Sequence, residues 1–406
     1  MKVAVIGGGA AGFFFAINAA EQNPNIRITI YEKTTKLLQK VKVSGGGRCN
    51  VTHHCFTSYK LAENYPRGQK VLKEIFKQFQ AKDVVDWFEK RGVQLKTEED
   101  GRMFPVSDTS QTIVDCFLKE AQKLNIDIKI SSHIKAIHKS EKCFLLYFSD
   151  GIVVEADRVV VATGGQMNIE SYSFLSELGL NLIAPIPSLF TFNDSSKKFV
   201  SLSGVSVQEA TVKIAGTKFE ETAPLLITHW GLSGPAVIRL SAWAAEYLHQ
   251  KQYNFTVLVN WAALKSENEV VGLLQAYKKM HPQKKIVSNP ILGLPTRLWQ
   301  QICDVSEIQS DKKWIDISLH QLNKLVENLY RCPFDIRGKT TFKEEFVTCG
   351  GVDLAEIDVT TMESKKVQGL YFAGEVLNID GITGGFNFQA AWSTAWLAAL
   401  AMKNQG

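Results

Sequence analysis

The stretch VIGGGAAGFF, residues 5–14, decides the fold. It follows a short β-branched strand predicted over Lys2–Ile6 and opens an apolar helix predicted over Phe13–Ala20. A second predicted strand, Arg27–Tyr31, completes a βαβ unit and is followed by Glu32, 20 residues after the last glycine of the stretch. This order and spacing are those of the dinucleotide-binding fingerprint, so the sequence predicts a Rossmann-like α/β domain that holds a dinucleotide at this turn.

Each glycine of the fingerprint has a physical role. Gly7 allows the tight turn, Gly9 lets the backbone approach a pyrophosphate, and Gly12 allows close packing of helix on strand. The N-terminus of the helix offers free N–H groups and a partial positive charge to the same pyrophosphate. Glu32 would accept hydrogen bonds from the adenosine ribose, and its charge disfavours a 2′-phosphate. The alternative is a glycine turn in a Rossmann-like fold without a ligand.

Three later segments favour FAD over NAD as the dinucleotide. Three short strands predicted within residues 133–155 precede an apolar strand that ends in Gly164-Gly165, an arrangement typical of FAD domains. Near the C-terminus, another apolar strand ends at the turn Gly374-Glu375. A glycine loop then opens an Ala-rich helix at Phe386-Asn387, and a positive helix end suits the N1/O2 edge of a flavin. An ordinary glycine turn before a helix is the alternative for this last motif.

The length and pattern of the chain predict an inserted second domain. At 406 residues the chain is too long for one ordinary core. After Pro187 the βα pattern gives way to short strands and turns, and it returns after about Thr340. We predict an α/β fold, a Rossmann-like discontinuous FAD-binding domain with an inserted antiparallel β-barrel plus helical subdomain. The expected boundaries are 1–187 and 341–406 for the FAD-binding domain and 188–340 for the insert, with a helical excursion over about 264–331.

Several elements are predicted within these domains. In the first domain we predict a basic, glycine-rich loop over Lys36–Asn50 and a helical stretch over about Gly68–Arg91. In the insert we predict helices over Ser266–Met280, Pro295–Asp304 and Ser318–Arg331.

Composition argues against several other classes of protein. The chain has 46 basic and 41 acidic residues, and aromatic and basic residues do not alternate along it, so we do not expect a nucleic-acid partner. The seven cysteines are widely spaced and form no C-x-x-C, which argues against a disulfide framework and against a metal site. Free cysteines fit a reducing compartment, so a cytoplasmic protein is expected.

Nothing in the sequence predicts a membrane partner. The glycine loop follows closely on Met1 and leaves no room for a signal peptide. The apolar run Ala390–Met402 is too short to span a bilayer, so we predict that it forms a buried helix. The sequence leaves the oligomeric state open.

Stretches along the whole chain resemble the YhiN/BaiN-like flavoproteins, an aminoacetone-oxidase-type family of NAD(P)/FAD-dependent oxidoreductases. The matching stretches are VIGGGAAGFF at 5–14, KVKVSGGGRCNVT at 40–52, GRMFPVS at 101–107, ATGG at 162–165, THWGLSGPA at 228–236, FVTCGGV at 346–352, and residues 372–391. The resemblance implies the discontinuous FAD domain with its insert, a fold similar to that of the fumarate reductase group of flavoproteins. It does not imply a substrate.

The resemblance also implies cofactor contacts at particular residues. The pyrophosphate turn is matched by Gly7, Gly9, Ala11 and Gly12, the ribose site by Glu32 and Lys33, and a backbone contact to adenine by Ile134. The loop beside the flavin is matched by Ser44, Gly45, Arg48, Cys49 and Asn50, and the second glycine turn by Thr163 and Gly164. The ribityl and ring contacts are matched by Gly374, Glu375, Gly385, Phe386 and Asn387. Many FAD proteins have Gly-Asp at the position of Gly374-Glu375, and a longer acid can meet the ribityl chain differently.

Two residues are candidates for catalysis. Arg48 could hold an anionic substrate or stabilise reduced flavin, or it could serve a phosphate contact or a structural salt bridge. His229, beside Trp230 in a glycine-rich loop of the insert, could donate a proton at the flavin face or could be a packed histidine. Cys49 and Cys55 invite comparison with a redox disulfide, but their spacing argues against one.

The sequence therefore predicts an FAD-dependent oxidoreductase that acts on a small-molecule substrate by hydride transfer through the flavin. Only one dinucleotide fingerprint is present, so NAD(P)H would dock transiently as a co-substrate, or O2 or another acceptor would reoxidise the flavin. One alternative is an FAD-dependent RNA-modifying enzyme, whose footprint would be Lys197-Lys198 and Lys278–Lys285. The other is a non-catalytic flavin redox sensor.

The purified protein is expected to be yellow and to release FAD on treatment with acid or heat, because the fingerprint holds a dinucleotide. Chromatography of the released chromophore against FAD and FMN standards measures this. Release of FMN alone, or of no flavin, would contradict the dinucleotide reading.

Overall fold

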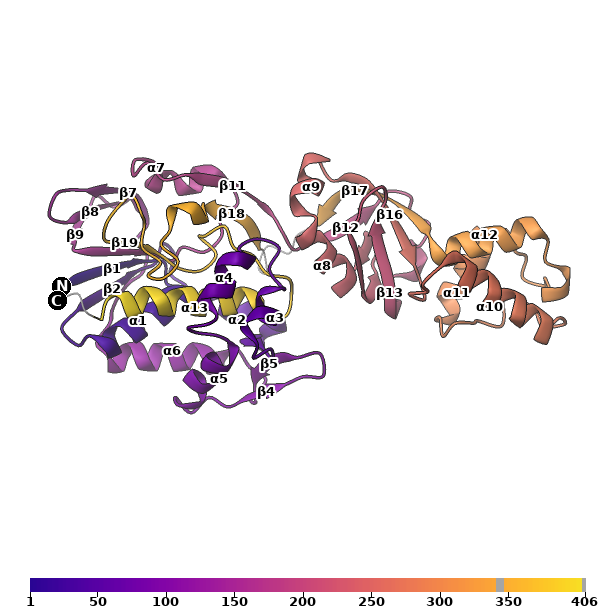
Figure 1. Ribbon diagram of the computed structural model, residues 1–406, viewed down its shortest axis with the longest axis horizontal. Coiled ribbons are helices and arrows are strands. Elements are labelled where there is room, and N and C mark those ends of the chain that lie inside the picture. Colours follow the sequence, from indigo (N-terminus) through magenta and orange to yellow (C-terminus); the bar gives the residue numbers. More distant parts are fainter. Residues whose placement is uncertain (341–346, 404–406) are drawn as a thin grey trace. The chain divides into compact units, whose positions relative to one another are not determined.

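The computed structural model describes residues 1–340 and 347–403, and the chain divides into two compact units (Figure 1). The first, which we call the Rossmann unit, joins residues 1–188 to the C-terminal segment. The second, the barrel unit, begins at Leu189 and lies between the two parts of the first in the sequence. Residue 341, an expected domain boundary, and Phe346 of the FVTCGGV stretch lie outside the described residues.

The described part of the Rossmann unit is built on a parallel sheet of five strands. Their order is β19-β10-β1-β2-β6, with bounds Leu370–Phe372, Arg158–Val161, Lys2–Ile6, Arg27–Tyr31 and Asp127–Lys129. In β1 and β10, residues such as Val5 and Val160 are fully buried, because both faces of the sheet are covered. Figure 1 shows the covering layers, with helices on one face and a three-stranded antiparallel sheet on the other. The helices are α1 (Ala10–Gln22), α6 (Gln111–Lys123) and α13 (Phe386–Ala401), and the strands are β7 (Ile134–Lys139), β8 (Phe144–Phe148) and β9 (Val153–Ala156).

Aromatic side chains hold the helical layer together. Phe14 of α1 lies 4.7 Å from Trp87 and 5.2 Å from Trp392 of α13, measured between ring centroids. Phe117 of α6 lies 5.6 Å from Trp392. Rings of this size bury large apolar areas, so this cluster fixes α1 and α13 beside each other.

Smaller elements complete the Rossmann unit, and two of them differ from expectation. The predicted loop over residues 36–50 contains α2 (Gln39–Gly47), which bends at its end because Gly45 and Gly46 have positive φ angles of 58° and 69°. The stretch predicted as helical over residues 68–91 is two helices, α4 (Gln69–Ile75) and α5 (Ala81–Glu89), with a capping box at Gln80 that starts the second. The others are α3 (Ser58–Ala62), α7 (Ser173–Ser176), β3 (Thr52–His53), β4 (Leu95–Thr97), β5 (Arg102–Pro105), β11 (Leu182–Pro187), β18 (Thr348–Val352), and 3-10 helices at Ile169–Tyr172 and Leu354–Glu356.

Six strands of the described chain close into an antiparallel barrel in the barrel unit. Their order around the barrel is β12-β15-β14-β13-β16-β17. The strands are β12 (Thr191–Asp194), β13 (Ser206–Ile214), β14 (Glu220–Ile227), β15 (Gly231–Ser233), β16 (Asn254–Asn260) and β17 (Cys332–Thr340). The helices α8 (Pro235–Trp243) and α9 (Ala245–Gln250) belong to the same unit, as does a 3-10 helix at Val200–Leu202.

A helical lobe extends the barrel unit between β16 and β17. It consists of α10 (Glu267–Met280), α11 (Thr296–Val305) and α12 (Leu319–Tyr330), with a 3-10 helix at Trp314–Asp316. Trp261, Trp299 and Trp314 are fully buried and share one apolar core with the barrel. The predicted fold class is thereby confirmed, a Rossmann-like domain interrupted by an antiparallel barrel and a helical region. Within the described chain, no helix has the length and apolar character needed to cross a membrane.

One buried ion pair holds the segment that leads into α13. Asp380 is fully buried and accepts hydrogen bonds from Ser188 and from Arg67, whose Nε lies 2.6 Å from Oδ1. Burial raises the pKa of the Asp380 carboxyl, and the nearby Arg67 guanidinium opposes that rise. The backbones of Arg67 and Asp380 also pair in an antiparallel bridge, and Ile382 N donates to Asn64 O at 2.9 Å. The pair therefore fixes the approach to α13 against residues 64–67.

Arg67→Leu is expected to lower the free energy of unfolding at neutral pH by about 3–5 kcal/mol, because a buried carboxylate loses its partner. Folding already raises the pKa of Asp380, and loss of Arg67 would raise it further. Protonation favours the folded state of such an acid, so the deficit should shrink as the pH falls and grow as it rises. Urea unfolding of variant and wild type over a pH series measures this. The control Arg67→Leu/Asp380→Leu should recover most of the loss, and a deficit independent of pH would refute the explanation.

Candidate functional site

The glycine turn after β1 is a point where three backbone segments meet. Gly7 has a φ of 117°, and a Cβ on it would overlap the carbonyl oxygen of Ala162 at the end of β10. A Cβ on Gly12 would overlap the carbonyl oxygen of Gly7, so the first turn of α1 lies directly on the strand end. A Cβ on Gly374, after β19, would come within 2.9 Å of the Cβ of Ala11. Larger residues would therefore push β1, β10 and β19 away from the start of α1.

Gly9 differs from its neighbours because it faces open space. It is the N-cap of α1, and a Cβ placed on it would meet no atom within 4 Å. Within the described residues, no side chain caps this helix. The first N–H groups of a helix have no partner inside it, so open space at an uncapped N-terminus is suited to a phosphate or another anion.

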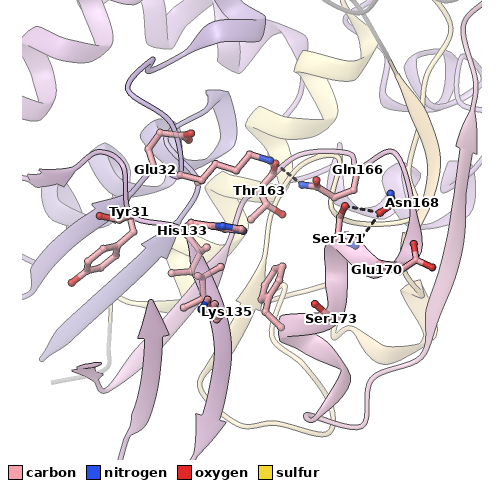
Figure 2. A pocket seen from close by; sticks show the side chains of 16 residues that line it. Tyr31, Glu32, His133, Lys135, Thr163, Gln166, Asn168, Glu170, Ser171 and Ser173 are labelled. Carbon is pink, nitrogen blue, oxygen red and sulfur yellow. Dashed lines mark hydrogen bonds between the residues drawn. The ribbon is translucent and has the colours of Figure 1, made fainter. Parts of the chain in front are cut away.

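A cavity of about 550 Å³ lies beside the glycine turn (Figure 2). It is lined by five residues expected at the cofactor, namely Gly7, Glu32, Lys33, Ile134 and Thr163. Figure 2 shows Glu32 and His133 on one side of it and Gln166, Asn168 and Ser171 on the other. The cavity is therefore lined by residues from β1, β2, β7 and the segment after β10, which meet beside the glycine turn before α1.

Two polar groups at this cavity indicate a bound partner. The Glu32 carboxylate accepts from Gly8 N at 2.9 Å and from Thr34 N at 2.8 Å, and a carboxylate retains further lone pairs for ribose hydroxyls. The Thr163 hydroxyl is buried and has no hydrogen-bond partner among the described residues. A buried hydroxyl without a partner is costly, so a ligand that bonds it fits this site. The residues present therefore fit the adenosine and pyrophosphate parts of a dinucleotide.

The second group of expected residues joins the loop after α2 to the start of α13. With its amide oriented to satisfy both neighbours, Asn50 accepts from Gly385 N and donates to Thr52 O, each at 3.0 Å. A Cβ on Gly45 would meet the Phe104 ring at 2.9 Å and the Asn50 backbone nitrogen at 3.1 Å. The Ser44 carbonyl accepts a hydrogen bond from Cys49 N at 3.0 Å, and this bond closes the turn over residues 44–49.

The N-terminus of α13 is a second helix end whose N-cap residue is a glycine. Its N-cap, Gly385, has a φ of 92° and no side chain of its own to cap the helix, and its N–H donates to the Asn50 side chain. Tyr65 donates to Phe386 O at 2.6 Å, and His53 stacks on the Phe386 ring at 4.7 Å. The Asn387 side chain closes the preceding loop, since it accepts from Gly381 N at 2.8 Å and donates to Gly381 O at 3.0 Å. The positive end of a helix held this firmly favours a negative charge beside it.

Glu375 reaches across the second glycine turn. Its Oε2 lies 2.7 Å from Lys40 Nζ, and its Oε1 accepts from Thr348 N at 3.1 Å. A Cβ on Gly165 would come within 2.6 Å of the same carboxylate, so the turn after β10 passes directly beside it. Gly164, with a φ of 71°, has open space around it. The longer acid thus ties α2 and β18 to this turn.

Cys49 is not a reactive thiol in this structure. It is fully buried, and burial raises the pKa of its thiol to about 12. Cys55 is also a free cysteine. A thiol that stays protonated at neutral pH is a poor nucleophile, so the site does not support a redox disulfide here.

The two candidate catalytic residues lie in different units. Arg48 donates to Glu98 at 2.6 Å and lies 4.0 Å from the centroid of the Phe104 ring. His229 belongs to the barrel unit, where it is exposed and its ring lies edge-on to Trp230 at 4.4 Å. His229 is therefore not grouped with the cofactor-site residues inside the Rossmann unit.

Sequence reasoning missed the residues that close the far side of the cavity. Asn168 Oδ1 accepts from Ser171 N at 3.1 Å, and Gln166 Nε2 donates to Thr163 O at 3.4 Å. The only sequence signal is an N-x-x-S helix cap just after the ATGG stretch. Lys40 was also missed, because its role depends on Glu375, which is remote in the sequence.

Comparison with known proteins gives a family and several relatives. The family described as "HI0933-like protein Rossmann domain" matches residues 1–401. The chain is 31% identical to a ribosomal RNA dihydrouridine synthase of Escherichia coli (strain K12), over 97% of this chain and 96% of the relative. It is 25% identical to a 3-dehydro-bile acid delta(4,6)-reductase of Clostridium scindens, over 98% of each chain. The fold is similar to that of 3-ketosteroid delta1-dehydrogenase from Sterolibacterium denitrificans, with a TM-score of 0.53 and 11% identity over 100% of this chain and 99% of the other.

Gly9→Val is expected to abolish FAD binding without disturbing the fold, because the branched side chain would enter the open space before α1, where a Cβ meets no protein atom within 4 Å. The ratio of flavin to protein absorbance measures bound cofactor. Thermal unfolding should match that of wild type stripped of FAD, since ligand binding itself stabilises. Gly12→Ala is the contrasting variant and should destabilise the protein even without FAD. A Gly9→Val protein that keeps its full flavin content would show that the phosphate lies elsewhere.

Proposed function

This chain belongs to the HI0933-like family of proteins with a Rossmann domain, which confirms the resemblance drawn from its motifs, and we propose that it is an FAD-dependent reductase. The reaction we propose is reduction of a carbon–carbon double bond conjugated to a carbonyl group. The observation that carries the proposal is the cavity at Gly7, Glu32 and Thr163 beside the uncapped N-terminus of α1. Bound FAD would supply the hydride.

The names of two relatives support this reaction class. One relative makes dihydrouridine, which is uridine saturated at the carbon–carbon bond next to a ring carbonyl. The other is a delta(4,6)-reductase of a 3-dehydro compound, in which the double bonds are conjugated to the 3-keto group. The chemistry common to both names is addition of a hydride and a proton to an activated double bond.

We propose a uracil base in RNA as the substrate. The identity of 31% over nearly the whole chain, to a relative named for ribosomal RNA, supports this choice. An RNA substrate differs from the small-molecule substrate that we expect from the nearly balanced charge of the chain. A small conjugated ketone is the second candidate, supported by the relative named for a bile acid.

The residues of the site have distinct roles in this proposal. Glu32 and Thr163 would hold the ribose and the pyrophosphate region, and Glu375 with Lys40 would hold the second glycine turn in place. The N-terminus of α13 would favour negative charge on the N1/O2 edge of the flavin, an effect of about 0.3–2 kcal/mol. NAD(P)H would dock transiently, because the sequence holds one dinucleotide fingerprint.

The proposal also gives a role to each of the two candidate catalytic residues, His229 and Arg48. His229 would supply the proton, since its side chain is exposed. A substrate phosphate at Arg48 would compete with Glu98, which Arg48 now binds. Arg48 also lies 3.6 Å from Asp108, so it contacts a substrate anion only if both ion pairs open. Ion pairs at a protein surface are weak.

The test uses the FAD-loaded protein with NADH or NADPH and unmodified ribosomal RNA transcribed in vitro. Nuclease digestion and mass spectrometry should detect nucleosides that have gained two hydrogens, and Gly9→Val should give none. Turnover of a 3-keto steroid with a conjugated double bond, without any change in RNA, would instead support the second candidate. Reduction of the flavin by NAD(P)H with neither substrate consumed would contradict the proposed reaction.

A further inference from the structure

Lysine side chains gather at one end of the helical lobe. Between residues 277 and 286 the sequence has four lysines and no acidic residue. The fold adds two more, because the segment after α11 returns to this place. Lys285 pairs with Lys313 in an antiparallel bridge, and Ile286 N donates to Lys312 O at 2.9 Å. We call these residues the lysine face: Lys278, Lys279, Lys284, Lys285, Lys312 and Lys313.

The charges of the lysine face are not balanced by the protein. Within the described residues, none of the six lysines forms an ion pair, whereas Lys324 of the same lobe is paired with Glu307. Asp311 and Asp316 flank the second segment in the sequence, but neither is paired with a lysine of the face. The face is therefore open to an anion from outside.

Lys285 and Lys313 form an arrangement that is unfavourable without such an anion. Residues directly opposite each other in an antiparallel pair have Cβ atoms about 4.5–5.5 Å apart, and like charges there destabilise the pair. An anion that both side chains can reach relieves this repulsion. A chain of phosphates does so for several lysines at once, which is the source of most nucleic-acid affinity.

Aromatic and apolar side chains lie among these lysines. Tyr277 in the last turn of α10 and His281, the C-cap of this helix, have ring centroids 4.6 Å apart, and Lys284 Nζ lies 6.0 Å from the centroid of the Tyr277 ring. Met280 and Ile315 are 66% and 52% exposed. Unstacked RNA bases stack on aromatic side chains such as the rings of Tyr277 and His281. Alternation of basic and aromatic residues, absent along the sequence, is thus present in the fold.

We propose that the lysine face binds the sugar–phosphate backbone of RNA. The proposal rests on the proposed function, in which a base of RNA is the substrate, and it adds the surface that holds the strand. Phosphate contacts of this kind position a substrate without reading its sequence. Binding at the lysine face is therefore expected to be sensitive to salt and tolerant of sequence.

The test measures binding of the FAD-loaded protein to a fluorescein-labelled transcript of ribosomal RNA by anisotropy. The variant Lys284→Gln/Lys285→Gln/Lys313→Gln should raise Kd at least about tenfold at low salt and reduce the slope of log Kd against log salt by about 2. The control Lys218→Gln/Lys251→Gln/Lys265→Gln removes the same charge from exposed sites on the barrel unit outside the face, and it should leave Kd nearly unchanged. Because Lys285 and Lys313 lie in a backbone bridge, Lys278→Gln/Lys279→Gln on α10 is a second test and should also weaken binding.

The outcomes separate this proposal from the proposed function. If wild type binds RNA and the lysine-face variants bind equally well, the lysine face is refuted and an RNA substrate still stands. If the control weakens binding as much as the lysine-face variants, RNA affinity depends only on the net charge of the protein, and the lysine face is again refuted. If wild type binds no RNA, both the lysine face and the RNA substrate are refuted, whereas flavin content and turnover of a conjugated ketone test the reductase independently.

Discussion

The close contact of three backbone segments at Gly7 is the constraint on which the rest of the structure depends. The carbonyl of Ala162 and the first turn of α1 both approach this residue so closely that neither Gly7 nor Gly12 has room for a Cβ. Gly374 brings the end of β19 against Ala11 in the same way. These contacts place the uncapped end of α1 at the carboxyl edge of the parallel sheet, where open α/β sheets bind their ligands. Among the three glycines of the fingerprint, Gly9 alone faces open space. Residues 7–12 therefore provide both the close packing of the strand ends on α1 and a place suited to an anion.

The fold could be predicted largely from local patterns. The helices expected over residues 266–280, 295–304 and 318–331 begin and end within a residue of α10, α11 and α12, because their apolar periodicity is strong. The loop expected over residues 36–50 was wrong in part, since α2 forms before the glycines that bend it. Within the candidate site, fingerprint and family resemblance point to Gly7, Glu32 and Thr163. Lys40 could not be found, because its role depends on Glu375, which is far away in the sequence. Gln166 and Asn168 bond close neighbours in the sequence, and an N-x-x-S cap is the only local pattern there.

The charge of the chain is distributed unevenly over the fold. A net charge of +5 over 406 residues argues against nucleic acid when it is averaged over the chain. The fold concentrates that charge, because the bridge between Lys285 and Lys313 joins two basic segments, and α10 turns Tyr277 and His281 toward each other. The RNA reductase that we propose would need a cofactor site and a surface that binds the RNA backbone, and the cavity at Glu32 and the lysine face are our candidates for them.

The most direct measurement is a crystal structure of the protein purified with its flavin. The account predicts FAD with its adenosine in the cavity at Glu32 and Ile134, its pyrophosphate over Gly9 at the start of α1, and its ring at the N-terminus of α13. A flavin bound elsewhere, with Gly9 and Glu32 making no contact to it, would contradict the account.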